Sequence, residues 1–596
     1  MMRCLVSFAV ALGVMGSILS GATPARCQST PQWIWDDAKA NEKATQEPLV
    51  FRRSFEVEGE VKTANLWISA DNRYEVVVNS ILVGQGENWQ LPQHYVLEGL
   101  LRSGQNQVVI RAKNDDDGPG ALAAWLSYEH GDGTVTLGTD AGWQCRKDTS
   151  NDNDLWWVAG DDTQWKPAIA LGGIRVTAPW GNQVAWDQPE TIEIERSLRP
   201  KQERFEFLDG DRVTWIGGTW VERQQAYNYF ETLVTSAYPK REIQFRNLGW
   251  SGDDVTGIAR AVFGSQEDGF KRLRDDLLRT APNVIIVGYG ANEAFQGEAG
   301  LAAFEEQWGR LARLLNSTGA EVVVIGPHYM ENLGPPLPDP SGVNQSIDLY
   351  SEALKSWSGE QNYHFVDFRT PLGDSASASK FVPAIRNRLT DNGMHFNDYG
   401  YWRTAPILAE KLNVPTQRWA VDIRLSGPEF SVEGGTGKFS TFKQAKIEFT
   451  IQDHHLPFAS APSTSPQGGE LSATRSHFTI KDLPEGNYGL NINGQPTVMA
   501  SHEQWANGIT LDRGQAISQI EDLRQAIVKK NELYFHRYRP QNETYLFLFR
   551  KHEQGNNAVE VPQFEALVAE QEKRIRQLKI AQPVKYELIR IEATNE

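Results

Sequence analysis

The chain has 596 residues, of which 40% are hydrophobic, and it carries a formal net charge of −17. A chain of this length exceeds what one hydrophobic core supports, so we expect about three or four domains. The 19 Trp, 17 Tyr and 25 Phe provide ample material for packed interiors, which excludes wholesale disorder. The acidic charge argues against nucleic acid or anionic lipid as the main partner, because phosphate binding depends on clustered Lys and Arg.

Residues 1–25 have the features of a signal peptide. Arg3 supplies a positive charge, Leu5 to Leu19 is an uncharged apolar run, and Ser20-Gly21-Ala22 is a small-residue cleavage site. The run is shorter than a membrane span and no second one follows it. We therefore expect an exported protein, periplasmic or extracellular, without stable membrane insertion.

Two cysteines remain after removal of the signal peptide, Cys27 and Cys145. In an oxidising compartment they either form a disulfide or stay as two free thiols, and both alternatives remain open. The sequence contains no CxxC, CxxCH or HExxH spacing. We therefore expect neither a metal site nor an organic cofactor.

Residues 30–180 are predicted to form a β-sandwich, because short alternating runs are separated by Asn, Asp and Gly turns. Such runs are Asn65–Ala70, Tyr74–Val78 and Gln107–Ala112. The segment Ala70–Asn79 followed by Gly104–Val108 resembles galactose-binding-like jelly rolls, which flank many bacterial glycosidases and sugar esterases. The tryptophans of this module are either sandwich core, which we expect for most of them, or sugar-stacking platforms. They are Trp33, Trp35, Trp89, Trp125, Trp143, Trp156 and Trp157.

Residues 200–414 alternate apolar β-branched runs with amphipathic helices, which is typical of a doubly wound parallel sheet in a three-layer α/β domain. The predicted strands are Val213–Ile216, Gln244–Leu248, Asn283–Val287, Glu321–Ile325 and His364–Asp367. The predicted helices are Val221–Tyr238, Phe270–Thr280, Phe304–Leu315, Tyr350–Gly359 and Tyr401–Leu412. Ligands of such sheets bind at the carboxyl ends of the strands.

The rest of the chain is predicted to form a second, small β-sandwich and a helical extension. Residues 416–510 return to short strands with Gly turns, such as Ala445–Ile451. Residues 511–596 are predicted to be largely helical, with helices at Gln515–Tyr538 and Gln563–Leu578.

Four short segments carry the chemistry. They are Trp215-Ile216-Gly217-Gly218-Thr219, Asn247-Leu248-Gly249-Trp250-Ser251-Gly252-Asp253, Val287-Gly288-Tyr289-Gly290-Ala291-Asn292-Glu293 and Leu389-Thr390-Asp391-Asn392-Gly393-Met394-His395-Phe396-Asn397. In this order they resemble the four sequence blocks of the SGNH (GDSL-like) hydrolase superfamily of esterases, lipases and polysaccharide deacetylases. The first three follow predicted strands directly, and the fourth precedes the last helix of the α/β domain.

The first block implies a nucleophile at Thr219, where the family's Gly-Asp-Ser is Gly217-Gly218-Thr219. A hydroxyl at a strand-to-helix turn is exposed and close to helix N–H groups, although the methyl group of Thr crowds the attack. The alternative is a purely structural role, since Thr219 and Glu222 have the spacing of a helix capping box.

The fourth block implies a base at His395, but the Asp of the family's Asp-x-x-His is Asn392 here, and Asp391 lies one residue too early. We expect Asn392 to accept the imidazole N–H through its carbonyl without stabilising the imidazolium by charge. Loss of that charge, or the wrong tautomer, costs about 10⁴ in rate in a serine triad. The alternative is a structural histidine.

The second and third blocks imply oxyanion donors. Gly252 would offer its backbone N–H with no side chain in the way, and the Asn292 amide would donate a second hydrogen bond. The alternatives are an ordinary Ser-Gly-Asp turn and a capping Asn.

A C-terminal tract rich in His, Arg, Asn and Glu contains three arginines of interest, Arg537, Arg539 and Arg550. We hypothesise that the tract folds over the cleft and that these guanidiniums bind an acidic or polyhydroxylated substrate. The alternative is a network of salt bridges between domains.

These observations predict an exported SGNH-like hydrolase that cleaves ester groups on a small molecule or polysaccharide, with acetyl as the expected substituent. One alternative is a catalytically degenerate carbohydrate-binding or cell-envelope protein that keeps the fold. A third is a structural assembly module whose flanking β-domains are the functional part.

Overall fold

The computed structural model describes residues 30–79, 81–131, 133–148, 156–157, 164–193, 199–200, 202–369, 373–382, 388–415, 419–427, 429–443, 446–462, 475–512 and 515–591. The expected signal peptide and Cys27, one partner of the disulfide considered above, lie outside the described residues. The chain forms two compact units, the first ending at Ser197 and the second containing Leu198 to Glu596.

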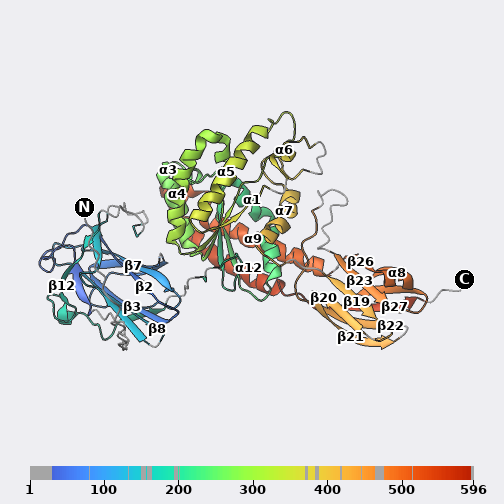
Figure 1. Ribbon diagram of the computed structural model, residues 1–596, viewed down its shortest axis with the longest axis horizontal. Coiled ribbons are helices and arrows are strands. Elements are labelled where there is room, and N and C mark those ends of the chain that lie inside the picture. The colour runs from blue at the N-terminus through green and yellow to red at the C-terminus, as the bar shows by residue number, and fades with distance from the viewer. Residues whose placement is uncertain are drawn as a thin grey trace, which may run out of the picture. The chain divides into compact units, whose positions relative to one another are not determined.

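The N-terminal unit consists of two sheets (Figure 1). Its strands are β1 (Gln32–Trp35), β2 (Leu49–Val57), β3 (Val61–Asp71), β4 (Arg73–Val78), β5 (Ile81–Gly86), β6 (Gln93–Val96), β7 (Gly104–Lys113), β8 (Ala121–His130), β9 (Gly133–Gly138), β10 (Gln144–Lys147), β11 (Lys166–Pro167), β12 (Ile169–Gly173) and β13 (Glu190–Glu193). One sheet has the order β12-β1-β8-β3-β6-β13, with β9 beside β8, and the other has the order β11-β10-β2-β7-β4-β5.

Most tryptophans of this unit belong to its core, as expected. Trp33 and Trp35 are fully buried, and the ring of Trp33 lies 4.9 Å from that of Trp180. The partly buried Trp67 and Trp125 stack in near-parallel planes, with ring centroids 5.3 Å apart. The interior of the sandwich therefore accounts for the aromatic richness of this part of the sequence.

The second unit begins with a three-layer α/β domain. Its strands are β14 (Arg212–Gly217), β15 (Gln244–Asn247), β16 (Val284–Gly288), β17 (Glu321–Ile325) and β18 (His364–Val366), all parallel and in the order β15-β14-β16-β17-β18. Its principal helices are α1 (Thr219–Tyr227), α2 (Tyr229–Ala237), α3 (Gln266–Arg279), α4 (Leu301–Ser317), α5 (Ser341–Glu360), α6 (Ser375–Ala378) and α7 (Asp398–Lys411). Along β16, Val284 and Ile286 pack with α1, α2 and α7, whereas Ile285 and Val287 pack with α3, α4 and α5. Because both faces are covered, the strand is apolar throughout, and the predicted parallel sheet is confirmed.

The single helix predicted from Val221 to Tyr238 is wrong, because two helices meet at Asn228. Asn228 adopts the left-handed conformation, with φ 52° and ψ 28°, and its N–H donates to the carbonyl of Gln224. Asn tolerates this conformation better than most residues, so it ends α1 and lets α2 start in a new direction.

The small β-domain also has two sheets (Figure 1). Its strands and one short helix are β19 (Ala420–Arg424), β20 (Glu429–Glu433), β21 (Gly435–Lys443), β22 (Lys446–Asp453), β23 (Arg475–Lys481), β24 (Asn487–Ile492), β25 (Gln495–Ser501), α8 (His502–Asn507), β26 (Ile509–Asp512) and β27 (Val584–Ile591). The sheet orders are β20-β19-β23-β26 and β21-β22-β27-β24-β25. Residues 584–591, predicted as part of the helical extension, are thus a central strand, and Val584, Tyr586 and Leu588 alternate into the core.

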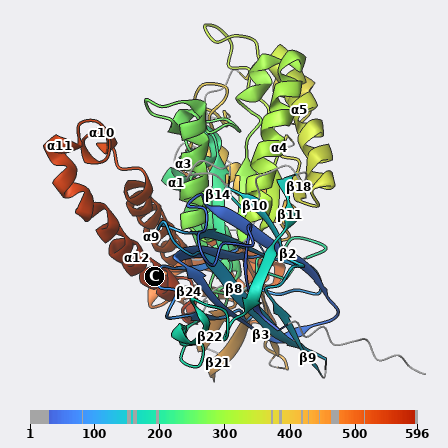
Figure 2. The same cartoon turned by 90° about the vertical axis from the view of Figure 1, so that its left-hand side faces the viewer.

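Between β26 and β27 the chain returns to the α/β domain as a helical hairpin (Figure 2). Its elements are α9 (Gln515–Tyr538), α10 (Glu543–Leu546), α11 (Lys551–Gln554), a 3₁₀ segment (Gly555–Gln563) and α12 (Phe564–Leu578). The helices α9 and α12 run side by side. Ile520 and Leu523 of α9 are buried in the same core as α2 and α7, so the hairpin is an integral layer of the α/β domain.

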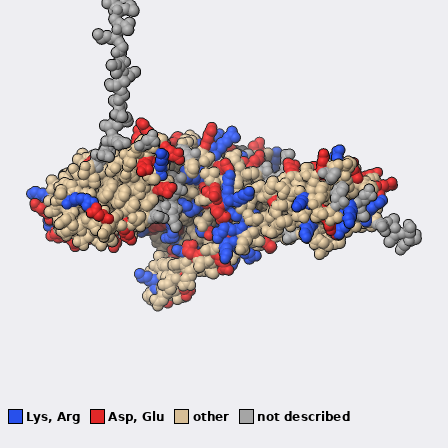
Figure 3. All heavy atoms as spheres, turned by 90° about the horizontal axis from the view of Figure 1, so that it is seen from below, with Lys and Arg blue, Asp and Glu red and all other residues tan. Residues whose placement is uncertain are grey.

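No helix in the described ranges has both the length and the apolar character needed to cross a membrane. On the face shown in Figure 3, basic and acidic side chains are interspersed.

Candidate active site

Thr219 lies at the turn from β14 into α1, at the carboxyl edge of the sheet. Its Oγ1 accepts a hydrogen bond from the backbone N–H of Gly252 at 3.1 Å. The capping-box alternative is wrong: the N-cap of α1 is Gly218, with no side-chain capping bond, and Glu222 accepts the N–H of Ser251 instead. The hydroxyl of Thr219 is therefore not used to start the helix.

Gly217 makes the turn narrow enough for this placement. Its φ is +155°, and a Cβ atom there would lie 2.5 Å from the carbonyl oxygen of Gly288 on the neighbouring strand. Only glycine permits this close approach of β14 and β16, which brings the first and third sequence blocks together.

Asn292 and Gly252 lie close to Thr219 on neighbouring loops. Asn292 Nδ2 donates to the carbonyl of Asp253 at 2.7 Å, and Asn292 forms no side-chain cap for the short helix after it. Gly252 has a φ of +78° and open space where a side chain would be. The two expected oxyanion donors thus meet at the turn that follows β15.

His395 contacts Asn392 with a polarity opposite to the expected one. Asn392 Oδ1 accepts the backbone N–H groups of Met394 at 3.1 Å and of His395 at 2.9 Å. The amide Nδ2 therefore faces the ring, 3.3 Å from His395 Nδ1. An amide nitrogen only donates, so Nδ1 is the acceptor and the proton of the neutral ring resides on Nε2.

Charged neighbours act on the same ring. Burial lowers the pKa of His395 below its ordinary value, Arg223 lowers it further, and Asp391 opposes both. Asp391 forms an ion pair with Arg223 at 2.5 Å and so does not take the place of the missing triad carboxylate. The imidazole is consequently kept neutral.

The structure brings Thr219, Asn292 and His395 together around one pocket of about 40 Å³. Gly252 joins them through its bond to Thr219, and Asn392 lies behind the imidazole. The other side chains and glycines around the pocket are Gly218, Trp220, Asp253, Gly288, Tyr289, Gly290, Ala291, Glu293, His328, Met330 and Met394.

His328 is a pocket residue that the sequence analysis missed. It is buried, its ring stacks on Phe396 with centroids 4.2 Å apart, and burial lowers its pKa to about 4. Its Nδ1 lies 2.8 Å from the carbonyl of Tyr329, which only accepts, so Nδ1 carries the proton and Nε2 has a free lone pair. Its position just after β17 at the carboxyl edge of the sheet is the signal that could have found it.

Glu293 belongs to the third block, but the sequence analysis gave it no role. Its carboxylate accepts the N–H of Val255 at 2.8 Å and that of Gly290 at 2.9 Å, which ties the second block to the third. Burial raises its pKa to about 7. Glu293, at a place where the family often has Asp, therefore holds together the loops that follow β15 and β16.

The three arginines expected to bind substrate lie outside this pocket. Arg537 pairs with Glu565 at 3.1 Å, and Arg550 pairs with Glu553 on its own segment at 2.5 Å. Arg539 is paired with Glu222. All three arginines are thus in salt bridges outside the acyl-transfer pocket, but of these three pairs only that of Arg539 with Glu222 joins the tract to the α/β domain, as the interdomain alternative requires.

Arg539 nevertheless contacts the second block. Its guanidinium lies 3.6 Å from the ring centroid of Trp250 and 2.8 Å from Glu222, the carboxylate that binds the N–H of Ser251. One residue earlier, the Tyr538 hydroxyl donates to the carbonyl of Gly249 at 2.9 Å. The end of α9 therefore supports the turn that carries Gly252.

Comparison with known proteins relates the α/β part to an acylhydrolase family. Residues 210–403 match the family model described as "GDSL-like Lipase/Acylhydrolase family", which supports a GDSL-like acylhydrolase domain in this part of the chain. A solved structure of a gut microbial diltiazem-metabolizing enzyme covers 65% of this chain and 100% of its own, with 14% identity and a TM-score of 0.50, which shows a common fold.

Two further similarities are more limited. An alpha-L-rhamnosidase of Streptomyces avermitilis is 29% identical over 160 residues, which are 25% of this chain and only 15% of that relative. A putative acylhydrolase of Bacteroides fragilis covers 35% of this chain and 90% of its own, with 16% identity and a TM-score of 0.25.

Proposed function

We propose that the protein is an acylhydrolase that transfers a small acyl group from an ester to water. Thr219 Oγ1 attacks the ester carbonyl, and His395 takes its proton and passes it to the departing alcohol. Water, deprotonated by the same histidine, then releases the acyl group as a carboxylic acid. The Thr219 and Gly252 N–H groups and the Asn292 amide hold the oxyanion.

The observation that carries this proposal is the bond from the Gly252 N–H to Thr219 Oγ1, beside a pocket that also includes Asn292 and His395. A hydroxyl, a candidate oxyanion donor and an imidazole thus line one pocket, which supports acyl transfer at this place. The family match of residues 210–403 supports the same chemistry.

The pocket volume supports acetyl as the acyl group. A pocket of about 40 Å³ accommodates only a few water-sized groups, because one ordered water already needs roughly 10–15 Å³. An acetyl group fits this space, whereas a longer acyl chain would extend beyond it.

The contact of Asn392 with His395 supports a slow enzyme. Nε2 is protonated in the resting ring, so the proton must first move to Nδ1, and Asn392 has no free acceptor there. The wrong tautomer in a serine triad costs about 10⁴ in rate. The same observation favours a second candidate, a protein that binds esters or glycans without turnover.

We also propose that the ester substituent is carried by a carbohydrate and that the protein acts after export. The naming of one relative as an alpha-L-rhamnosidase agrees with a sugar substrate. The N-terminal apolar run with Arg3 and the small residues after it agrees with export.

Hydrolysis of 4-nitrophenyl acetate by the full chain tests the proposal. We expect measurable turnover that is lost in His395→Ala and increased in Thr219→Ser, which removes the crowding methyl group. The exposed His552 provides a matched control, and His552→Ala should match the wild type. Equal rates for wild type and His395→Ala would leave the binding protein as the better account.

A further inference from the structure

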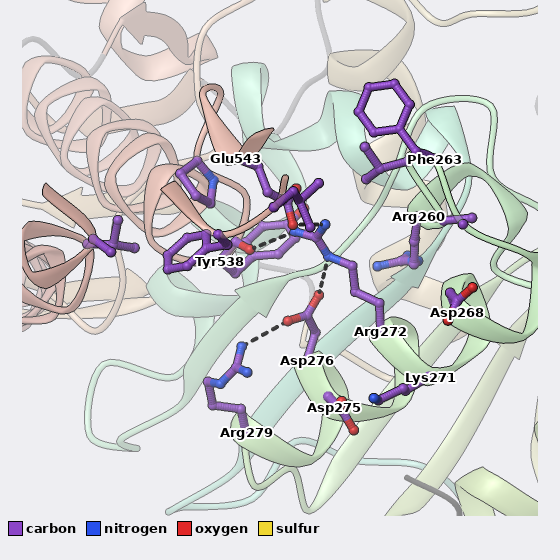
Figure 4. Close-up of a pocket in the computed structure, with 18 of the residues that line it drawn as sticks. Arg260, Phe263, Asp268, Lys271, Arg272, Asp275, Asp276, Arg279, Tyr538 and Glu543 are labelled. Atoms are coloured by element: carbon purple, nitrogen blue, oxygen red, sulfur yellow. Dashed lines mark hydrogen bonds and ion pairs between the residues drawn. The ribbon is translucent and has the colours of Figure 1, made fainter. Parts of the chain in front are cut away.

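A second and larger pocket, of about 840 Å³, lies between α3 and the helical hairpin (Figure 4). One wall comes from residues 260–279, and the other comes from residues 537–562. Both walls belong to the second compact unit. None of its lining residues takes part in the acyl-transfer pocket.

Aromatic rings form the rim of this pocket. Phe263 is 71% exposed and Phe549 is 68% exposed, and their ring centroids lie 5.5 Å apart in an edge-to-face arrangement. Phe547 adds a third exposed ring from the hairpin. Exposed aromatic groups that gather around a cavity are typical of a binding site.

The floor offers a buried donor without a partner. The side chain of Arg260 is fully buried, its Nε donates to Asp253 at 2.7 Å, and its Nη2 donates to the carbonyl of Leu248 at 2.8 Å. Its Nη1 has no hydrogen-bond partner among the described residues. A buried guanidinium N–H left in this state is costly, so a ligand hydroxyl that enters between the lining side chains and accepts from Nη1 is favoured.

The same floor offers a buried acceptor. Asp276 Oδ1 accepts from Arg279 at 2.9 Å, whereas Oδ2 lies 3.7 Å from Arg272 Nε and receives no hydrogen bond from the described residues (Figure 4). Oδ2 is likewise enclosed, so a ligand group that reaches it between the lining side chains and donates a hydrogen bond is favoured here as well.

Charges in the pocket are nearly balanced. Its lining includes five basic and four acidic side chains, namely Arg260, Lys271, Arg272, Arg279, Arg537, Asp268, Asp275, Asp276 and Glu543. A strongly charged ligand would meet repulsion from one set of these groups, so a neutral ligand suits the pocket better.

We propose that this pocket binds a neutral sugar ring of an oligosaccharide. A hydroxyl both accepts, as Arg260 Nη1 requires, and donates, as Asp276 Oδ2 requires. The C–H face of a pyranose packs on the exposed rings of Phe263 and Phe549. This binding does not depend on ester cleavage at Thr219.

Isothermal titration of the full chain with neutral hexasaccharides of glucose, xylose and mannose tests the proposal. We expect at least one of them to bind. The double variant Phe263→Ala/Phe549→Ala should bind it at least ten-fold more weakly. Phe381 is 56% exposed and lies outside this pocket, so Phe381→Ala is the matched control and should bind like the wild type. Failure of all three sugars to bind, or undiminished binding by the double variant, would overturn the proposal.

A second variant and a salt series test the polar floor. Asp276→Asn keeps the size of the side chain but removes its negative charge, and binding should weaken at least ten-fold. Because Asp276 is buried beside Arg272 and Arg279, binding is measured at a temperature well below the thermal unfolding midpoint of the variant. Since the ligand is neutral, affinity should hardly change between about 0.05 and 0.5 M NaCl, a range over which exposed charges become screened. A steep loss with salt would instead indicate an anionic ligand and contradict the proposal.

His395→Ala should retain full sugar binding. Sugar binding at this pocket is thereby tested separately from ester hydrolysis at Thr219.

Discussion

Asn392 presents its amide nitrogen to Nδ1 of His395 at 3.3 Å, because two backbone N–H groups occupy its carbonyl oxygen. The proton of the neutral imidazole is thereby held on Nε2, the nitrogen whose lone pair must be free if His395 is to act as a general base. The same amide thus predicts a slow reaction at a site that otherwise brings the residues of the four blocks together.

Asn392→Asp should increase the turnover of 4-nitrophenyl acetate by at least about 100-fold. This is part of the roughly 10⁴-fold loss of kcat that removal of the carboxylate causes in a serine triad. A carboxylate accepts the two backbone N–H groups and the Nδ1–H together, which frees Nε2 and stabilises the imidazolium. The measurement is kcat. Asp391→Asn, one residue away, is the control and should change kcat only a few-fold; equal rates for both variants and the wild type would contradict the tautomer argument.

Arg223→Gln should move the acid limb of the kcat/KM profile to higher pH. The base works when neutral, and Arg223 helps to lower the pKa of His395, so the limb of the wild type lies below the ordinary imidazole value. Removing this positive charge raises that pKa toward the ordinary imidazole value. Asp391→Asn should move the limb in the opposite direction, and shifts of the same sign in both variants would refute the assignment.

Arg539→Ala should slow ester hydrolysis by about ten- to a hundred-fold, the range expected for a displacement of about 1 Å in a catalytic group. Arg539 holds Glu222, which in turn binds the N–H of Ser251, next to the Gly252 oxyanion donor. The effect should appear in kcat, with KM nearly unchanged. Arg550→Ala removes a guanidinium that pairs with Glu553 on its own segment instead, and it should leave kcat unaltered.

Lys530→Ala should lower the free energy of unfolding by about 3–5 kcal/mol, the cost of leaving one member of a buried ion pair uncompensated. Lys530 Nζ lies 2.5 Å from Glu231 of α2, and both side chains are almost fully buried. Denaturant midpoints measure the change. Its neighbour Lys529 is half exposed and pairs only with Glu532 among the described residues, so Lys529→Ala should lower the free energy by no more than about 1 kcal/mol.

The α/β domain could be predicted because its strands are distinctive by themselves. The run Val284–Val287 is apolar at every position, as a strand buried on both faces must be, and the motifs follow such runs. The candidate residues Thr219, Asn292 and His395 were found through the resemblance of their sequence blocks to the SGNH superfamily. Thr219 and Asn292 also follow predicted strands, at the edge of the sheet where ligands bind.

Other features depend on partners that a local pattern does not reveal. The strand β27 pairs with β22 and β24, which are far away in the sequence, and its alternating residues follow directly on a helical pattern. The polarity of the Asn392 contact depends on which backbone N–H groups reach its oxygen. His328 follows β17 as a single histidine, without a motif around it.

The insertion of β27 between β22 and β24 has a consequence for biosynthesis. While the ribosome is still producing the helical hairpin, these two strands have no neighbour on their inner edges and are open to pairing with other nascent chains. A premature stop anywhere within the hairpin would leave that state permanent, so we expect such truncated products to be aggregated or degraded even though every residue of the acyl-transfer pocket has been translated.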